Sequence, residues 1–168
     1  MARALLIHVR FHDGRYHGEP DWPPSPARLF QALLAGCARC GGVSDIARSA
    51  LLWLETLEPA VIAVPTARLG QRLTSYVPNN DLDAKDGDPA RIGEIRVAKA
   101  IKPQLFDAGI PLHFVWPLDS SEQSEGNARH MLCIANTLYQ LGRGVDMARV
   151  SPPSRRRSAL AGCCRRLA

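Results

Sequence analysis

The sequence lacks the features that mark membrane proteins and several common enzyme classes. No stretch approaches the roughly 20 consecutive apolar residues that a membrane-spanning helix needs. There is no nucleotidase-type phosphate loop, no Gly-x-Ser-x-Gly elbow and no pair of carboxylates at helical spacing. Charged residues at Arg10 and Asp13 follow a very short apolar run, which is not a signal-peptide pattern. We therefore expect a cytoplasmic protein without membrane contact.

The cysteines are irregularly placed. The five cysteines are odd in number, which does not fit a disulfide framework. Cys37 and Cys40 have the spacing of a metal or redox pair, but they fall on the apolar side of an expected helix and are interpreted as core residues. Cys163 and Cys164 are adjacent, a geometry that rarely completes a zinc site. The sequence predicts no metal and no cofactor.

Acidic residues are absent from residues 149–168, which hold six arginines. The rest of the chain carries 15 basic and 16 acidic residues, so the net charge of +5 comes from this end alone. The end is also a mixture of serine, proline, arginine, alanine and cysteine without strand alternation. We predict one domain over residues 1–148 and an irregular basic tail over residues 149–168, such as a frameshift would produce.

Hydrophobic periodicity predicts an α+β domain. Helices are expected from Pro26 to Cys40, between Ser44 and Pro59, and from a capping box at Ser120 to the glycines at 142 and 144. Strands are expected over residues 3–12, 60–64, 73–77 and 110–118. This order is that of the ferredoxin-like β-α-β-β-α-β fold, but no final strand is evident, so we expect the fold to be incomplete there.

Charged and aromatic side chains gather before the first expected helix. Trp22 is held between prolines, and Ser25 is placed to cap the helix that begins at Pro26. Arg15, Tyr16 and Arg28 are close in sequence. A ring with two guanidiniums suits a bound polyanion, whereas a ring pinned by prolines also suits packing against the core. Both interpretations stay open at this point.

Five sequence blocks in order resemble those of a known family. The blocks are residues 14–16, 22–30, 50–55, 76–81 and 141–144. The chain resembles the type I-U (I-G) CRISPR-associated RAMP subunit, a fusion of a Cas-five-like and a Cas-six-like domain. The resemblance covers roughly residues 3–146 and only the Cas-five-like half. The missing last strand and second domain depart from the family pattern.

The resemblance implies a noncatalytic subunit that binds the 5′ handle of the guide RNA (crRNA) within a CRISPR type I surveillance complex in antiviral defence. Its partners would be the guide RNA and the other subunits of the effector complex. Stacking of a base on an aromatic ring contributes about 1–3 kcal/mol, and basic side chains bind the RNA backbone. The expected RNA-binding residues are Arg15, Tyr16, Trp22, Arg28, Arg96, Lys99, Lys102 and Arg143.

Two other functions stay open, as does a nonfunctional fragment that cannot complete its sheet. The first is a metal-independent endoribonuclease that processes CRISPR repeat RNA, with His12 as the best catalytic candidate among five histidines. In the resembled family this activity belongs to the second half, which the chain lacks. The second is a noncatalytic α+β protein-interaction fragment, in which Trp22 is a packing anchor and Gly142 an ordinary helix C-cap.

Overall fold

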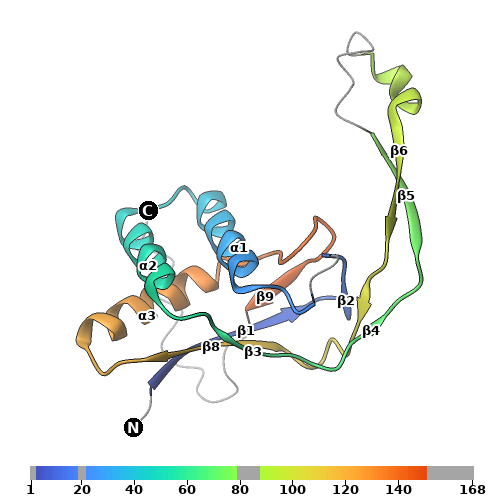
Figure 1. Cartoon of the computed structure of the whole chain (residues 1–168). Coiled ribbons are helices and arrows are strands. Elements are labelled where there is room, and N and C mark those ends of the chain that lie inside the picture. Colours follow the sequence, from blue (N-terminus) through green and yellow to red (C-terminus); the bar gives the residue numbers. More distant parts are fainter. Residues whose placement is uncertain (1–2, 19–21, 79–87, 151–168) are drawn as a thin grey trace.

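A four-stranded antiparallel sheet forms the centre of the molecule (Figure 1). The computed structural model describes residues 3–18, 22–78 and 88–150. The strand order is β3-β8-β1-β9. The strands are β1 (Arg3–Phe11), β3 (Val61–Ala63), β8 (Leu112–Leu118) and β9 (Ala148–Val150). The two long strands, β1 and β8, pair along their lengths from Arg3 opposite Leu118 to Val9 opposite Leu112.

One face of this sheet is apolar and covered by three helices (Figure 1). These are α1 (Pro26–Arg39), α2 (Asp45–Thr56) and α3 (Glu122–Ala135). Every second residue of β1 from Leu5 to Phe11 is buried, as are Leu112, Phe114 and Trp116 of β8. Alternation along a strand places such residues on one face, where they pack against the helices. The predicted α+β class and the apolar faces of these two strands are confirmed.

The first two helices begin at the predicted residues. The Ser25 hydroxyl accepts a hydrogen bond from the N–H of Arg28 at 3.2 Å, and the Ser44 hydroxyl accepts one from the N–H of Ala47 at 3.3 Å. Each bond satisfies an N–H that the helix itself leaves without a partner. The start of α1 therefore lies at a sharply defined point beside Trp22.

The third helix differs from its prediction at both ends. Its N-cap is Ser121, whose hydroxyl accepts from the N–H of Ser124 at 3.1 Å, and not Ser120. It ends at Ala135, because the next turn tightens into bonds from Thr137 N–H to the Ile134 carbonyl and from Leu138 N–H to the Ala135 carbonyl. The apolar pattern continues to Leu138 and Leu141, which stay buried in a non-helical segment.

The last strand, which sequence patterns did not reveal, is present as β9. Arg149 pairs with Arg10, and Ala148 with Phe11, so β9 occupies the edge of the sheet beside β1. Three residues are too short to show strand alternation in a sequence. The predicted tail over residues 149–168 therefore begins with two strand residues, and its remainder, residues 151–168, lies outside the described residues.

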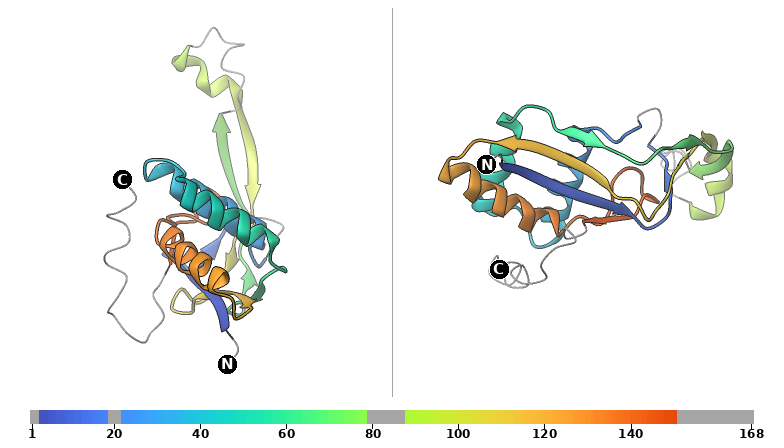
Figure 2. Two further views of the ribbon diagram at one scale, coloured as in Figure 1. Left: turned by 90° about the vertical axis from the view of Figure 1, so that its left-hand side faces the viewer. Right: turned by 90° about the horizontal axis from the view of Figure 1, so that it is seen from below.

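A two-stranded ribbon extends away from the helices and the main sheet (Figures 1 and 2). It consists of β5 (Leu73–Pro78), a 3₁₀ helix, η2 (Pro89–Ile95), and β6 (Arg96–Ile101), with Leu73 opposite Ile101 and Pro78 opposite Arg96. At its base lies a small sheet of β2 (Arg15–Tyr16), β7 (Gln104–Leu105) and β4 (Arg68–Leu69). The polar, acidic stretch over residues 79–88 has the composition of a surface loop or insertion, and its residues 79–87 lie outside the described residues.

None of the helices in the described ranges is long and apolar enough to cross a membrane.

Candidate functional site

The loop Gly142–Asp146 lies against β2 and is held there by a buried carboxylate. Asp146 is 2% exposed. Its Oδ1 accepts from the backbone N–H of His17 at 2.9 Å and from the ring Nδ1 of His17 at 2.7 Å, and its Oδ2 accepts from the N–H of Arg143 at 2.6 Å. One carboxylate thus joins two segments separated by 129 residues. Charged acceptors make stronger hydrogen bonds than neutral ones, so this contact defines the shape of the loop.

Gly142 is required at its place in the loop. Its φ is +126°, a value that side-chain-bearing residues rarely adopt. A Cβ there would overlap Oδ2 of Asp146 and would lie 2.8 Å from Cε2 of Tyr16. By contrast, a Cβ on Gly144 would meet nothing within 4 Å. The first glycine is therefore structural, and the second leaves an open approach to the loop.

Tyr16 cannot serve as the base-stacking platform that we expected. The residue is 1% exposed and packs edge-to-face on Phe11 at 5.8 Å between ring centroids. A ring with both faces against protein has no surface for a base. Its position in β2, opposite Gln104, directs it into the core, while its neighbour Arg15 is exposed.

Trp22 is also a packing residue. It is half-buried and stacks on Phe106 at 4.8 Å and 27°, and it lies 5.7 Å from Tyr16. The packing-anchor interpretation of this tryptophan therefore agrees with its contacts, and the aromatic group serves to fix the entry into α1.

Two of the predicted arginines lie around the glycine loop. Arg28, in the first turn of α1, lines a small cavity of about 170 Å³ together with Gln31, Tyr139, Gln140 and Gly142. Its Nε is buried without a hydrogen-bond partner among the described residues. Arg143 is exposed in the loop itself. The structure thus brings Arg28 next to the loop that carries Arg143.

A neighbouring cavity of about 130 Å³ contains His12, the catalytic candidate, and a second histidine, His17. It is lined by His12, Asp13, Arg15, His17, Val145, Asp146 and Met147. His12 is exposed, and its backbone N–H donates to the Met147 carbonyl at 3.0 Å. Here His12 shares an opening with Arg15 and with the hydrogen-bonded His17 and Asp146. Asp146 could not be identified from the sequence, because a single acidic residue four positions after Gly142 forms no recognisable motif.

The remaining predicted basic residues are on or beside the ribbon, apart from the glycine loop. Arg96 and Lys99 are exposed on β6, and Lys102 is half-buried just beyond it. Arg96 and Lys99 are three residues apart, so they point to opposite faces of the ribbon. Arg91 is partly neutralised by an ion pair with Glu94 at 3.0 Å. These residues therefore form no single basic track.

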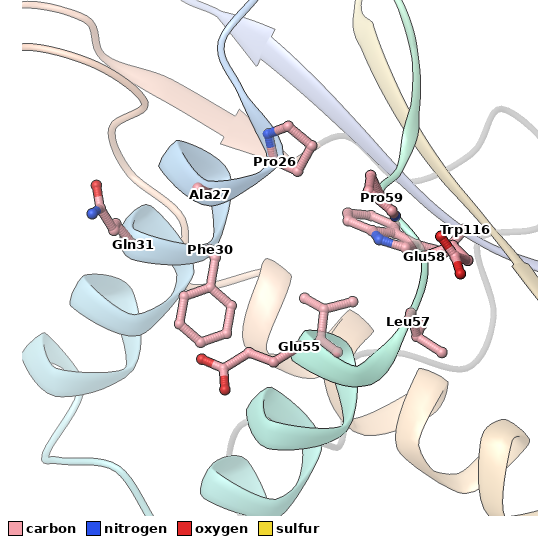
Figure 3. Close-up of a pocket in the computed structure, with 10 residues that line it drawn as sticks. Pro26, Ala27, Phe30, Gln31, Glu55, Leu57, Glu58, Pro59 and Trp116 are labelled. Atoms are coloured by element: carbon pink, nitrogen blue, oxygen red, sulfur yellow. The ribbon is translucent and has the colours of Figure 1, made fainter.

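An apolar pocket of about 430 Å³ opens between α1 and α2 (Figure 3). Phe30, Leu57 and Trp116 contribute apolar surface, and Glu55 and Glu58 stand at its rim. This volume falls within the range of small-molecule or side-chain sites. The lining offers no positive charge, so the pocket does not suit a phosphate.

No group of three or more metal-ligating side chains occurs in the part of the chain that the structure describes. Cys37 is buried and Cys40 exposed, and both are free thiols.

A comparison with family models identifies the chain as CRISPR-associated. The model of a family described as CRISPR-associated protein, GSU0054 family, matches residues 2–148. The chain therefore belongs to this CRISPR-associated family, which indicates a role in CRISPR defence.

A solved structure of another CRISPR protein is among those similar to this chain. It is a crystal structure of a CRISPR protein from Archaeoglobus fulgidus, with 15% identity and a TM-score of 0.38 over 90% of this chain. The chain covers 60% of the length of that protein. A comparison with curated proteins found no match.

Proposed function

We propose that this chain binds the 5′ handle of a guide RNA as a subunit of a CRISPR type I surveillance complex of the I-U (I-G) type. The observation that carries the proposal is the glycine loop, clamped by Asp146, with Arg143 exposed in it and Arg28 beside it. Membership in a CRISPR-associated family supports the proposal that the chain acts within a CRISPR complex. Its partners would be the guide RNA and other subunits of the complex in the cytoplasm.

The physical argument rests on what an RNA backbone requires. Phosphates bind to guanidinium groups and to backbone N–H groups that they can approach closely. Gly144 leaves open space beside the loop, and Arg15, Arg28 and Arg143 supply charge at one end of the domain. Because the loop is anchored before RNA arrives, little conformational entropy is lost on binding.

The topology supports a ferredoxin-like assignment for the domain. The main-sheet strands and helices follow each other as β1, α1 with α2, β3, β8, α3 and β9, and the sheet order places β1 and β8 at the centre. This is the β-α-β-β-α-β succession, with the ribbon inserted between β3 and β8. The resemblance of the sequence to the RAMP family implies the same ferredoxin-like architecture.

The test is a binding assay with the full chain. A repeat-derived handle RNA and a scrambled RNA of equal length are titrated at two salt concentrations. We expect tighter, salt-sensitive binding to the handle, and a loss of about tenfold for the combined Arg28→Ala and Arg143→Ala changes. Arg48→Ala, an exposed arginine on α2, is the matched control. Equal affinity for both RNAs, or no effect of the paired change, would refute the proposal.

The cavity that holds His12 favours a second function, metal-independent cleavage of repeat RNA. Two histidines, an arginine and two carboxylates share this opening, and such groups can move a proton from a 2′-hydroxyl and stabilise the charge that develops on phosphorus oxygens. Incubating labelled repeat RNA with the protein and a chelator tests this. Cleavage that disappears in His12→Ala would establish the enzyme; intact RNA throughout would leave the binding function alone.

A further inference from the structure

Within the described residues, no helix covers the second face of the central sheet. The helices cover one side of the sheet (Figure 1). Ile7, Val9 and Phe114 belong to the core on that side, so the alternate residues of each strand face the other way. On β1 these residues are Leu6, His8 and Arg10, on β8 His113 and Val115, on β3 Val61 and Ala63, and on β9 Arg149.

Strand register places the basic members of this face together. His8 lies directly opposite His113, and their rings meet edge-to-face with centroids 4.6 Å apart. Arg10, two residues further along β1, lies directly opposite Arg149 of β9. Four side chains that are cationic or able to become so therefore occupy two adjacent rows from three strands.

No acidic residue occupies the uncovered face among the described strand positions of β1, β3, β8 and β9. Arg10 donates one hydrogen bond, from Nη1 to the carbonyl of Gly109 at 2.8 Å, which leaves its charge without a counter-ion in the described part of the chain. The next row, Leu6, Val115 and Val61, is apolar. The face thus has a basic end and an apolar end.

Among the described residues, one ring nitrogen of each histidine has no hydrogen-bond partner. Nε2 of His8 and Nδ1 of His113 are buried and make no hydrogen bond to any described residue. Burial, and then repulsion from His113 and Arg10, lowers the pKa of His8 below its ordinary value of 6.5. An anion on this face would oppose this lowering, because its negative charge stabilises the protonated ring.

We propose that this face, with His8 and His113 beside Arg10 and Arg149, binds the sugar-phosphate backbone of single-stranded RNA. The inference rests on the proposed RNA-binding function and adds a second contact surface to the glycine loop. Phosphates lie on the basic rows, while the apolar row contacts riboses or base faces. The histidine pair takes up a proton as the phosphate binds, so affinity rises as pH falls.

The charged and titratable groups that face His8 come from every neighbouring strand. They are Arg10 on its own strand, His113 on β8 and Arg149 on β9, while β3 contributes only Val61 and Ala63. None of these groups is an acid that would supply a competing negative charge. The pH dependence is therefore assigned to His8, whose pKa these surroundings lower.

The experiment measures binding of the full chain to a short uridine homopolymer at about pH 5.5 and about pH 8, at constant ionic strength. We expect affinity to be about threefold to tenfold higher at the lower pH, since uptake of one proton permits at most tenfold per pH unit. The combined His8→Gln and His113→Gln changes should remove this difference, and Arg149→Ala should weaken binding at both pH values. Arg48→Ala is the control.

Two results would overturn the proposal. One is a pH difference that persists in the double histidine variant. The other is an unchanged set of His8 and His113 ring signals in NMR spectra when RNA is added, which would leave the face to a protein partner. The Arg28 and Arg143 variants keep the two proposals separate, because they should lower handle affinity without altering the pH difference.

Discussion

Asp146 organises the candidate site at the scale of single residues. It is buried and accepts three hydrogen bonds, two of them from the backbone N–H groups of His17 and Arg143. A buried donor left without an acceptor costs about 1–3 kcal/mol. The shape of the loop around Arg143 therefore depends on this carboxylate more than on the arginine itself.

We expect Asp146→Ala to lower the free energy of unfolding by about 2–5 kcal/mol, because it leaves the N–H groups of His17 and Arg143 unsatisfied. Asp146→Asn keeps one oxygen and should lose less. Urea unfolding of both variants measures these values. A loss below about 0.5 kcal/mol for the alanine variant would mean that the carboxylate does not anchor the loop.

The two glycines of the loop provide a matched pair. Gly142→Ala should destabilise the protein by about 2 kcal/mol or more, since the φ of +126° and the overlap with Asp146 both oppose a side chain. Gly144→Ala should change stability by less than about 0.5 kcal/mol, because its Cβ would enter open space. Thermal unfolding compares them, and similar losses in the two variants would contradict this account.

The lowered pKa of His8 predicts that the stability of the protein without RNA depends on pH. The pKa of His8 is lowered in the folded protein, so the unfolded chain binds the proton more strongly below about pH 6.5. Stability should therefore fall as the pH decreases from about 7.5 to 5, and His8→Gln should reduce that fall. His130→Gln, at an exposed position on α3, is the control and should behave as the original protein.

At the scale of elements, the ribbon formed by β5 and β6 is separable from the body. Most of its residues are exposed, including Leu73, Tyr76 and Val97. Its base is closed by a hydrogen bond of 2.7 Å from the Gly70 N–H to the Pro103 carbonyl. A two-stranded ribbon contributes little stability by itself. We therefore expect the ribbon to contribute to binding and not to the stability of the body.

Replacing residues 71–102 by an Asn-Gly turn should leave the body folded, because Gly70 and Pro103 are already neighbours. We expect a melting temperature within a few degrees of the original, and weaker RNA binding if Arg96, Lys99 and Lys102 contribute. Circular dichroism and the binding assay measure both effects. Loss of cooperative unfolding would show that the ribbon supports the core.

At the scale of the whole molecule, β9 completes the sheet with three residues. Ala148 is 1% exposed and pairs with Phe11, and Val150 pairs with Val9. Without this strand the edge of β1 would present unpaired N–H and carbonyl groups, which favours aggregation.

A chain ending at residue 150 should unfold cooperatively and stay monodisperse, whereas one ending at residue 147 should melt earlier and aggregate. The difference arises because only the longer chain retains the pairing of β9 with Val9, Arg10 and Phe11. Size-exclusion chromatography and thermal unfolding give the comparison. Equal behaviour of the two chains would show that β9 adds nothing to the fold.

Local patterns determined a large part of this protein. Alternation marked the buried faces of β1 and β8, and Ser25 and Ser44 marked the starts of two helices, because both signals act within a few residues. Ordered sequence blocks also pointed to a CRISPR-associated family, which the family match confirms.

Tertiary structure decided the rest. The burial of Tyr16, the pairing of β9 with β1, the rows of His8 with His113 and Arg10 with Arg149, and the bonds from Asp146 to His17 all join distant segments. Such contacts depend on how the chain closes loops of about a hundred residues and leave no periodic signal in the sequence. The sequence blocks supplied the arginines of the candidate site, but the contacts that bring them together follow from that closure.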